Sequence, residues 1–433
     1  MELLQGCRVQ NVDLGGDLHT IEFTQLDSEA STKARWVVDA AGRASLLKRQ
    51  LGLSRDVSHT IHSAWFRLDG GLDIEQWGAH DEGWMARMAE PGLRMYSTNH
   101  LLGEGYWIWL IPLGSGPISI GVCADPRFHP FEEISEFNRL LDWLRKHEPQ
   151  LAAAVEPRLD DIEDFLRVQD FAYGVERTYS PERWSLVGEA AAFPDPFYSP
   201  GSDMIAYGNT WTSDLIVRDL DGEDVGERLE YYNELYQRVF AHVLCRTEDG
   251  YPVFGNPWVT AAKLAWGSYS GHVGIVSLFT ANKFTDLEFM KSVDAELERL
   301  FQLNIRMEGL FSDWHALEQR PLPPMAIPGF PALIQSIPAL VRPYTDDELR
   351  EKLRTDLKVS EALAVIFFHR AAAALDHAPS PDARLNPYAL SLDPEKWDAD
   401  GLLDESGLNL AEAGELAPGA GALWPAESGA ATT

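Results

Sequence analysis

Residues 184–216 constrain the fold of this chain more than any other stretch. They begin with the apolar run WSLV, turn at Gly188-Glu189-Ala190, pass through a proline-rich loop at 194–201 and then read as a helix. The small residues let the backbone approach a flat or phosphorylated ligand closely. Ser202 and Asp203 are suited to cap the helix, whose free N–H groups favour an anion or an electron-rich ring edge. The pattern predicts a strand, a ligand-binding turn and a helix, although an ordinary strand-loop-helix connection would also have it.

The composition is that of a globular protein and excludes several classes of partner. Of the 433 residues 45% are hydrophobic, and the net charge is −31, which argues against nucleic acid and anionic membrane surfaces as partners. Residues 1–12 lack the apolar core of a signal peptide, and no apolar run approaches the roughly 18 residues of a membrane-spanning helix. Cys7, Cys123 and Cys245 form neither a disulfide framework nor a zinc pattern. We therefore expect a cytoplasmic protein without a bound metal.

A second pattern predicts another strand that ends near the same ligand. Val37 and Val38 suit a buried parallel strand, which is followed by the small-residue turn Asp39-Ala40-Ala41-Gly42-Arg43 and by a helix. Ligands in open α/β sheets bind beyond the carboxyl ends of the strands. We therefore expect strands 36–39 and 184–187 to be neighbours in one sheet, with both turns at the same edge.

The segment 105–113, GYWIWLIPL, is the most distinctive run of the chain. In a strand, Trp107 and Trp109 share one face with Ile111, and three further apolar side chains share the other face. Both faces are apolar, so we expect a strand that is buried on both sides and whose pairing ends at Pro112.

Together the three patterns resemble the flavin-dependent halogenases, in particular the tryptophan halogenase-like family, and their monooxygenase relatives. That family has a strand end V-V-D-A-S-G-R, a signature W-x-W-x-I-P, and a turn G-D-A-A/S followed by D-P-x-x-S-x-G. The residues at the corresponding positions are Asp39, Gly42 and Arg43 in the first, Trp107, Trp109 and Pro112 in the second, and Gly188, Glu189, Ala190, Asp195, Pro196, Ser199, Pro200 and Gly201 in the third.

The resemblance implies an FAD-dependent oxidoreductase of secondary metabolism. FADH2 from a separate flavin reductase, O2 and chloride or bromide would produce an electrophilic halogen, which reaches an electron-rich aromatic substrate, either free or tethered to a carrier. The matching residues of the two turns and the loop would bind FAD. Trp107, Trp109 and Pro112 would form the halogenase signature, in which the tryptophans lie near the flavin. Tyr198 stands where tryptophan halogenases have Glu, which favours phenols, pyrroles or unknown substrates over tryptophan.

The resemblance also implies the domain organisation. We expect an α/β (α+β) fold in which residues 1–55 and 180–245 form an FAD-binding domain around a parallel sheet. A mostly antiparallel β-sheet substrate domain would be inserted at 56–179, and a helical C-terminal region would span 246–377. The residues 378–433, rich in Asp, Pro, Gly and Ala, would form an extended or disordered acidic tail.

Departures from the family leave alternatives open. The sequence contains no G-x-G-x-x-G turn, which in the family holds the FAD pyrophosphate. We therefore expect a chain that lacks its N-terminal nucleotide-binding unit and by itself binds FAD weakly. The family's catalytic lysine belongs to the same unit, so no residue is assigned to it, and Glu189 replaces the usual Asp. An aromatic hydroxylase of the same fold and a truncated, non-catalytic chain are the alternatives.

Overall fold

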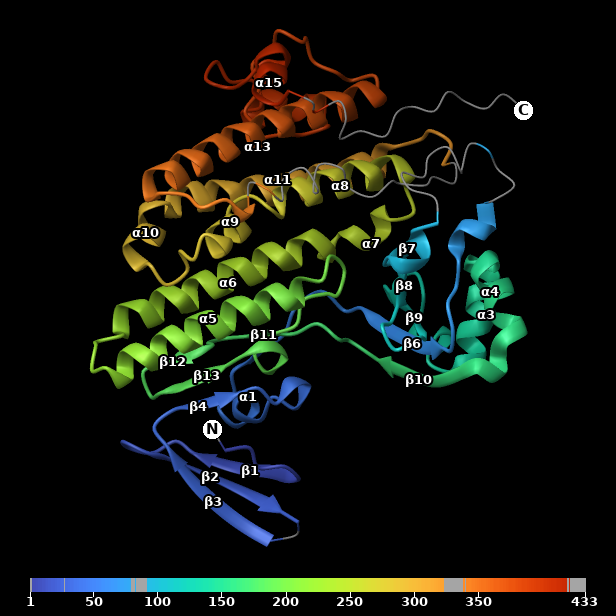
Figure 1. Cartoon of the computed structure of the whole chain (residues 1–433). Helices are drawn as coiled ribbons and strands as arrows, with labels where there is room; N and C mark the ends of the chain where they lie inside the picture. Colours follow the sequence, from blue (N-terminus) through green and yellow to red (C-terminus); the bar gives the residue numbers. More distant parts are fainter. Residues whose placement is uncertain are drawn as a thin grey trace. The chain divides into compact units, whose positions relative to one another are not determined.

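The computed structural model describes residues 2–26, 28–78, 82, 92–322, 338, 340–418 and 420 (Figure 1). The chain divides into two compact units. Unit 1 comprises Met1–His59, Ala172–Leu244 and Asn282–Leu287, and unit 2 comprises Thr60–Phe171, Cys245–Ala281 and Glu288–Thr433. The proline-rich stretch 320–343, predicted to be an ordered linker, lies mostly outside the described residues. No helix in the described part of the chain is long and apolar enough to cross a membrane.

The parallel sheet of unit 1 confirms the predicted pairing of the two motif strands. β4 (Val37–Asp39) pairs in parallel with β13 (Trp184–Leu186), with Asp39 opposite Leu186, and β12 (Tyr179–Ser180) pairs antiparallel on the other side of β13. β13 is buried, as expected. β4 is not buried on both faces, because Val38 points away from the face of Val37 and Asp39 and is 41% exposed.

A second sheet of unit 1 precedes β4. β1 (Cys7–Asp13) and β2 (His19–Gln25) form an antiparallel pair, and β3 (Ser28–Ala34) adds a third antiparallel strand beside β2. β3 could not be predicted, because its sequence, SEASTKA, contains no alternation of large apolar residues. The short strands β5 (Ser54–Arg55) and β11 (Gly174–Val175) pair separately.

The helices of unit 1 follow the motif strands. α1 (Leu46–Gln50) comes after β4, α5 (Pro200–Leu220) comes after β13, and α6 (Gly226–Glu248) comes after α5. Figure 1 shows α5 and α6 running side by side. Between them the Trp211 ring stacks on Phe284 at 5.1 Å and on Tyr232 at 5.7 Å, so aromatic packing fixes α5 and, with it, the position of its N-terminus.

Unit 2 contains the predicted antiparallel sheet. Its strands are β6 (His62–Leu68), β7 (Asn99–Gly103), β8 (Tyr106–Pro112), β9 (Ile118–Ala124) and β10 (Ile162–Val168), in the order β10-β6-β9-β8-β7. One face packs against α3 (Phe137–His147) and α4 (Pro149–Val155) in a continuous apolar core. Residues 93–98 contain the 3₁₀ turn Arg94–Tyr96, and residues 168–178 contain only the end of β10 and the two-residue strand β11.

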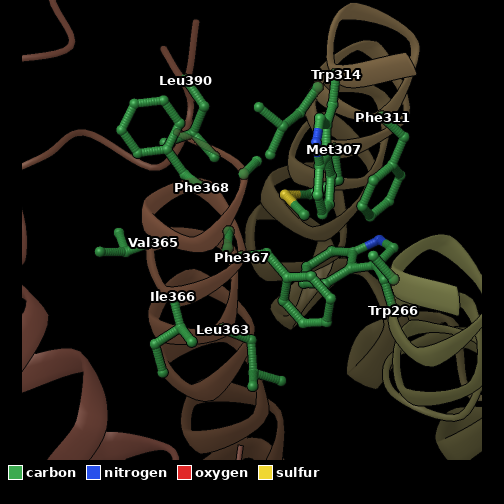
Figure 2. Close-up of a cluster of buried hydrophobic side chains, with 14 of the residues drawn as sticks. Trp266, Met307, Phe311, Trp314, Leu363, Val365, Ile366, Phe367, Phe368 and Leu390 are labelled. Carbon is green, nitrogen blue, oxygen red and sulfur yellow. The ribbon is translucent and has the colours of Figure 1, made fainter. Parts of the chain in front are cut away.

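The helical part of unit 2 packs around a second apolar core. Its helices are α7 (Gly250–Val253), α8 (Pro257–Ser270), α9 (Ile275–Thr280), α11 (Asp294–Leu317) and α13 (Asp346–Ala374), and α10 (Leu287–Ser292) leads into α11. Figure 2 shows Trp266 of α8, Phe311 and Trp314 of α11, and Phe367 and Phe368 of α13 in this core. Thr345 and Glu348 form a capping box at the start of α13, and α10 and α11 are separate helices that meet at Val293.

The prediction of an extended or disordered tail is wrong for residues 378–418. This segment forms the short helices α14 (Trp397–Asp400) and α15 (Leu410–Leu416), and Leu385 makes β-bridges to Leu403 and Leu408. The physical reason is a set of buried apolar side chains that join the core of α13: Leu385, Leu390, Leu392, Leu402 and Ala413. The Asp, Pro and Gly residues between them form the turns that bring these anchors to the core.

We expect the sheet domain to lose stability as the pH rises from about 5 through about 7. The Tyr106 hydroxyl donates a hydrogen bond to Glu148 Oε1 (2.8 Å), and burial raises the pKa of Glu148 to about 7. A carboxyl group whose pKa is higher in the folded than in the unfolded state makes its full contribution to stability below the unfolded pKa. That contribution is lost as the pH rises through 7. The loss should amount to about 2–3 kcal/mol between pH 5 and 8.

The Glu148→Gln variant isolates this effect. Burial lowers the pKa of neighbouring His147, which has the opposite pH dependence but is present in both proteins. The measurement is the urea midpoint of wild type and variant at both pH values. If the difference between the two midpoints does not change with pH, Glu148 is ionised normally in the fold.

Candidate functional site

The parallel pairing of β4 and β13 brings the two motif turns to one edge of the sheet of unit 1. The backbone N–H of Val187 donates to Asp39 O at 3.0 Å, and each strand then enters a 3₁₀ turn, Gly42–Ala44 in the first turn and Gly188–Ala190 in the second. Gly42 has φ +60° with no heavy atom within 4 Å of a Cβ built there, and Gly188 has φ +55°. Both positions therefore require glycine, and Gly42 leaves open space beside the first turn.

Tyr173 ties the two turns together. Its hydroxyl donates to Glu189 O at 2.7 Å, and the guanidinium of Arg43 lies 5.0 Å from the centroid of its ring. On the same ring lies the ammonium of Lys48, 4.0 Å from the centroid, which also donates to Ala191 O at 2.9 Å. Burial, with help from Arg49, lowers the pKa of Lys48 to about 8. Neither Tyr173 nor Lys48 belongs to a motif, so the sequence does not indicate their role.

Asp39 supports the first turn from inside. Its Oδ1 accepts a hydrogen bond from Ala41 N at 2.9 Å, and its Oδ2 accepts one from Leu47 N at 2.7 Å, at the start of α1. The side chain is buried. Both carboxylate oxygens are therefore engaged by the turn and the helix that follow it, which fits a residue that shapes the turn.

Asp195 has the same kind of role in the proline-rich loop. Its Oδ1 accepts a hydrogen bond from Phe197 N at 2.7 Å, and its Oδ2 lies 2.7 Å from His59 Nε2, with both side chains fully buried. His59 belongs to no motif of the sequence, and the structure makes it the partner of a motif residue 136 positions away. The pair anchors the loop where it leaves the sheet.

The end of the loop has an unusual backbone. Tyr198 and Ser199 both adopt left-handed conformations, with φ +67° and +58°, and Ser199 N donates to Pro196 O at 2.9 Å. Two successive non-glycine residues of this kind store strain, which occurs preferentially at ligand sites. α5 then begins at Pro200, so the prediction that Ser202 and Asp203 cap it is wrong. Proline is favoured at the first helical position because it has no N–H to satisfy.

Glu189 and the start of α5 provide unused polar groups. The carboxylate of Glu189 is half-buried and makes no hydrogen bond or ion pair within the described residues. Ser199, the N-cap residue, makes no side-chain capping bond to α5. A free carboxylate that can accept hydroxyl groups thus belongs to the same unit as a helix N-terminus that can donate N–H groups.

The tryptophan signature lies in β8 of unit 2. Trp107 is buried, and its Nε1 donates to the Tyr251 hydroxyl at 2.9 Å. Trp109 is half-buried, and its Nε1 donates to Ser119 Oγ at 3.0 Å, so β8 is not fully buried on the tryptophan face. Its indole covers Gly121 of β9, where an added Cβ would lie 2.1 Å from the ring. Pro112 is the last residue of β8, as predicted.

We expect Gly121→Ala to displace the Trp109 indole and to destabilise the sheet domain by about 1–3 kcal/mol, the usual cost of overpacking. The matched control is Gly114→Ala, because nothing lies within 4 Å of a Cβ at that position in the β8–β9 turn. Urea unfolding of both variants measures the effect. Equal midpoints for the two variants would show that Trp109 does not lie over Gly121.

Comparison with known proteins agrees with these features, although no model of a protein family matches the sequence. The chain is 32% identical over 148 residues to flavin-dependent halogenase chlA of Dictyostelium discoideum, covering 33% of this chain and 24% of that protein. It is 28% identical over 242 residues to tetracycline 7-halogenase of Kitasatospora aureofaciens, covering 53% of this chain and 42% of that protein. The aligned regions thus span less than half the length of these relatives.

A solved structure shows the fold. The crystal structure of halogenase PltM in complex with phloroglucinol and FAD has a TM-score of 0.53 and 17% sequence identity, and the similarity covers 82% of this chain and 69% of PltM. The chain is thus similar in part of its sequence to flavin-dependent halogenases, and it shares with PltM a mixed α/β fold with antiparallel sheets and a helical C-terminal region.

The residues of unit 1 fit a flavin nucleotide in part. Gly42 leaves open space, Glu189 has an unused carboxylate, and α5 presents its N-terminus after a strained loop. Asp39 and Asp195 are instead occupied with backbone groups and His59. In the part of the chain that the structure describes, no group of three or more His, Cys, Asp or Glu side chains could hold a metal ion.

Proposed function

We propose that the chain is an FAD-dependent halogenase of electron-rich aromatic compounds. The observation that carries this proposal is the pairing of β4 and β13, which sets the turns at Gly42 and Gly188 at one edge of a sheet. The W-x-W-x-I-P strand adds support from unit 2, and the halogenase relatives add support from comparison. FAD would be used as FADH2 from a separate flavin reductase, with O2 and chloride or bromide as co-substrates.

Each part of unit 1 would have a distinct role toward FAD. The backbone of the first turn at Gly42 and Arg43 and of the second turn at Gly188 and Ala190 would let the cofactor approach closely. The Glu189 carboxylate would accept hydrogen bonds from its hydroxyl groups, and the N–H groups at Gly201 would face its electron-rich part. When bound, FAD would supply the redox chemistry with O2. Asp39, Asp195, Pro196, Ser199 and Pro200 would hold the turns and the loop in shape.

The division of the chain follows from this assignment. Residues 1–55 and 180–245 would form the FAD-binding domain, 56–179 the substrate domain, and 246–377 the helical region. The substrate class comes from the relatives: PltM was crystallised with phloroglucinol, and another relative is named as a chlorinase of pyrrole-2-carbonyl bound to a peptidyl-carrier protein. Trp107 and Trp109, with Pro112 after them, would form the halogenase signature that hinders the ordinary monooxygenase reaction.

A product assay tests the proposal. The purified chain is incubated with excess FAD, a flavin reductase, NADH, air and bromide, and with phloroglucinol or a pyrrole-2-carbonyl carrier protein as substrate. We expect a product heavier by one bromine in place of one hydrogen, and at least about tenfold less of it with Glu189→Ala, which removes a charge-assisted hydrogen bond. A product heavier by one oxygen would identify a hydroxylase instead. Recovery of both substrates without any modification would contradict both activities.

A further inference from the structure

Tyr251 makes a contact with the signature strand that no motif indicates. It belongs to α7 in unit 2, and its hydroxyl accepts the hydrogen bond from Trp107 Nε1 at 2.9 Å. Tyr251 is fully buried and Trp107 is 2% exposed. A buried indole N–H without an acceptor would carry a full desolvation penalty, so this bond is well defined in the interior.

α7 is itself held against the turn that begins β8. The Gly105 N–H donates to Tyr251 O at 2.9 Å, two residues before Trp107. At Gly255, directly after α7, an added Cβ would lie 2.7–2.8 Å from atoms of Glu104, so the backbones meet too closely for a larger residue. The turn before β8 and α7 are therefore joined by a main-chain hydrogen bond, and Trp107 and Tyr251 join β8 and α7 by a side-chain hydrogen bond.

The other end of α7 rests on a buried ion pair. A Cβ at Gly250 would lie 3.2 Å from Lys263 Cε, and Lys263 pairs with Glu308 in the interior. Lys263 thus packs against Gly250, the first residue of α7. The Gly105 N–H binds the carbonyl of Tyr251, the second residue of α7. Tyr251 is consequently held from two sides and presents its hydroxyl at a fixed place.

Two further contacts of Trp107 are less directional than this hydrogen bond. Its ring lies 5.3 Å from His100 in an edge-to-face contact and 5.7 Å from Trp109 in a tilted one. Such ring contacts contribute about 0.5–1.5 kcal/mol beyond their buried area and are made over a range of offset and edge-to-face arrangements. The hydrogen bond to Tyr251 is directional and selects one of these orientations.

We propose that Tyr251 is a positioning residue that sets the orientation of the Trp107 indole on the sheet. Where its consequence concerns halogenation, the inference rests on the proposed function. A correctly oriented Trp107 would fix the surface that β8 presents in the proposed substrate domain. Loss of the Tyr251 hydroxyl should therefore lower the yield of halogenated product per FADH2 oxidised while leaving FAD affinity almost unchanged.

The direct test measures the indole itself. In the full chain labelled with ¹⁵N-tryptophan, the Trp107 indole signal is assigned by its disappearance in Trp107→Phe. In Tyr251→Phe we expect this signal to move upfield and its N–H to exchange about tenfold faster. The matched control is Tyr269→Phe, which removes a hydroxyl from α8 without touching Trp107 and should leave the signal in place. An unshifted Trp107 signal in Tyr251→Phe overturns the inference whatever the activity.

The second measurement separates this inference from the proposed function. We expect the ratio of halogenated product to FADH2 oxidised to fall about tenfold in Tyr251→Phe, with less than a twofold change in the FAD dissociation constant. A shifted Trp107 signal together with an unchanged ratio overturns the positioning role. If wild type makes no halogenated product while the Trp107 signal shifts, the proposed function fails and the orientation of Trp107 by Tyr251 stands.

Discussion

Replacing Lys263 by methionine is expected to destabilise the helical part of unit 2 by about 3–5 kcal/mol, because it leaves a carboxylate buried without its cation. Lys263 of α8 and Glu308 of α11 form an ion pair whose side chains are 2% and 9% exposed. Burial raises the pKa of Glu308, and Lys263 opposes this shift. In Lys263→Met the carboxyl group should take up a proton, at a cost that appears as lost stability at neutral pH.

The double variant Lys263→Met/Glu308→Met shows whether the charge is the cause. Two apolar side chains of similar size should restore most of the stability, since a buried ion pair is often no better than well-packed hydrophobic residues. Hydrogen exchange of peptides from α8 and α11 measures the free energy of opening in this part of the chain. A double variant as unstable as Lys263→Met would show that the lysine stem, and not the pairing of charge, supports these helices.

Replacing Asp195 by alanine is expected to have an effect of similar size in unit 1, about 3–5 kcal/mol on opening of the proline-rich loop. The change leaves the Phe197 N–H and the His59 ring buried without their acceptor, and each hydrogen bond to a carboxylate is worth about 1.5–3 kcal/mol. Because the loop carries the strained residues Tyr198 and Ser199, we also expect their left-handed conformations to relax.

A double-mutant cycle of Asp195 and His59 provides the control. His59→Leu and Asp195→Leu should each be destabilising, and the double variant should cost less than their sum, because the two residues are partners. Hydrogen exchange of peptides covering 194–201 measures the free energy of opening of the loop in each variant. Strict additivity would mean that His59 and Asp195 support the loop independently.

The sequence predicted the elements that depend on local patterns. The apolar runs at 37–39 and 184–186 predicted two strands, and the turns after them placed the candidate site at one sheet edge. The start of α5 was mispredicted because Ser202 and Asp203 are suitable caps, but Pro200 is better suited to the first helical position. The segment after residue 378 was mispredicted as extended or disordered, because its Pro, Gly and Asp residues are typical of such segments and its buried leucines are few and widely spaced.

The contacts that support the site could not be predicted in the same way. His59 and Asp195 are 136 residues apart, and Trp107 and Tyr251 are 144 residues apart. A single histidine or tyrosine among apolar residues has no spacing that distinguishes a partner of a motif from an ordinary core residue. Lys48 likewise reads as a surface residue of a short helix until the fold places Tyr173 and Ala191 beside it.

The central claim is that FAD binds at the turns that follow β4 and β13. Hydrogen exchange of the full chain with and without excess FAD tests it most directly, and Gly188→Val serves as the control because a Cβ there would be strained at φ +55° and would lie 3.2 Å from Ile205. We expect FAD to slow exchange in peptides covering 40–47 and 188–203 of wild type, and not in Gly188→Val, with α8 and α11 unaffected. Exchange in both turns that is unchanged at saturating FAD would contradict the claim.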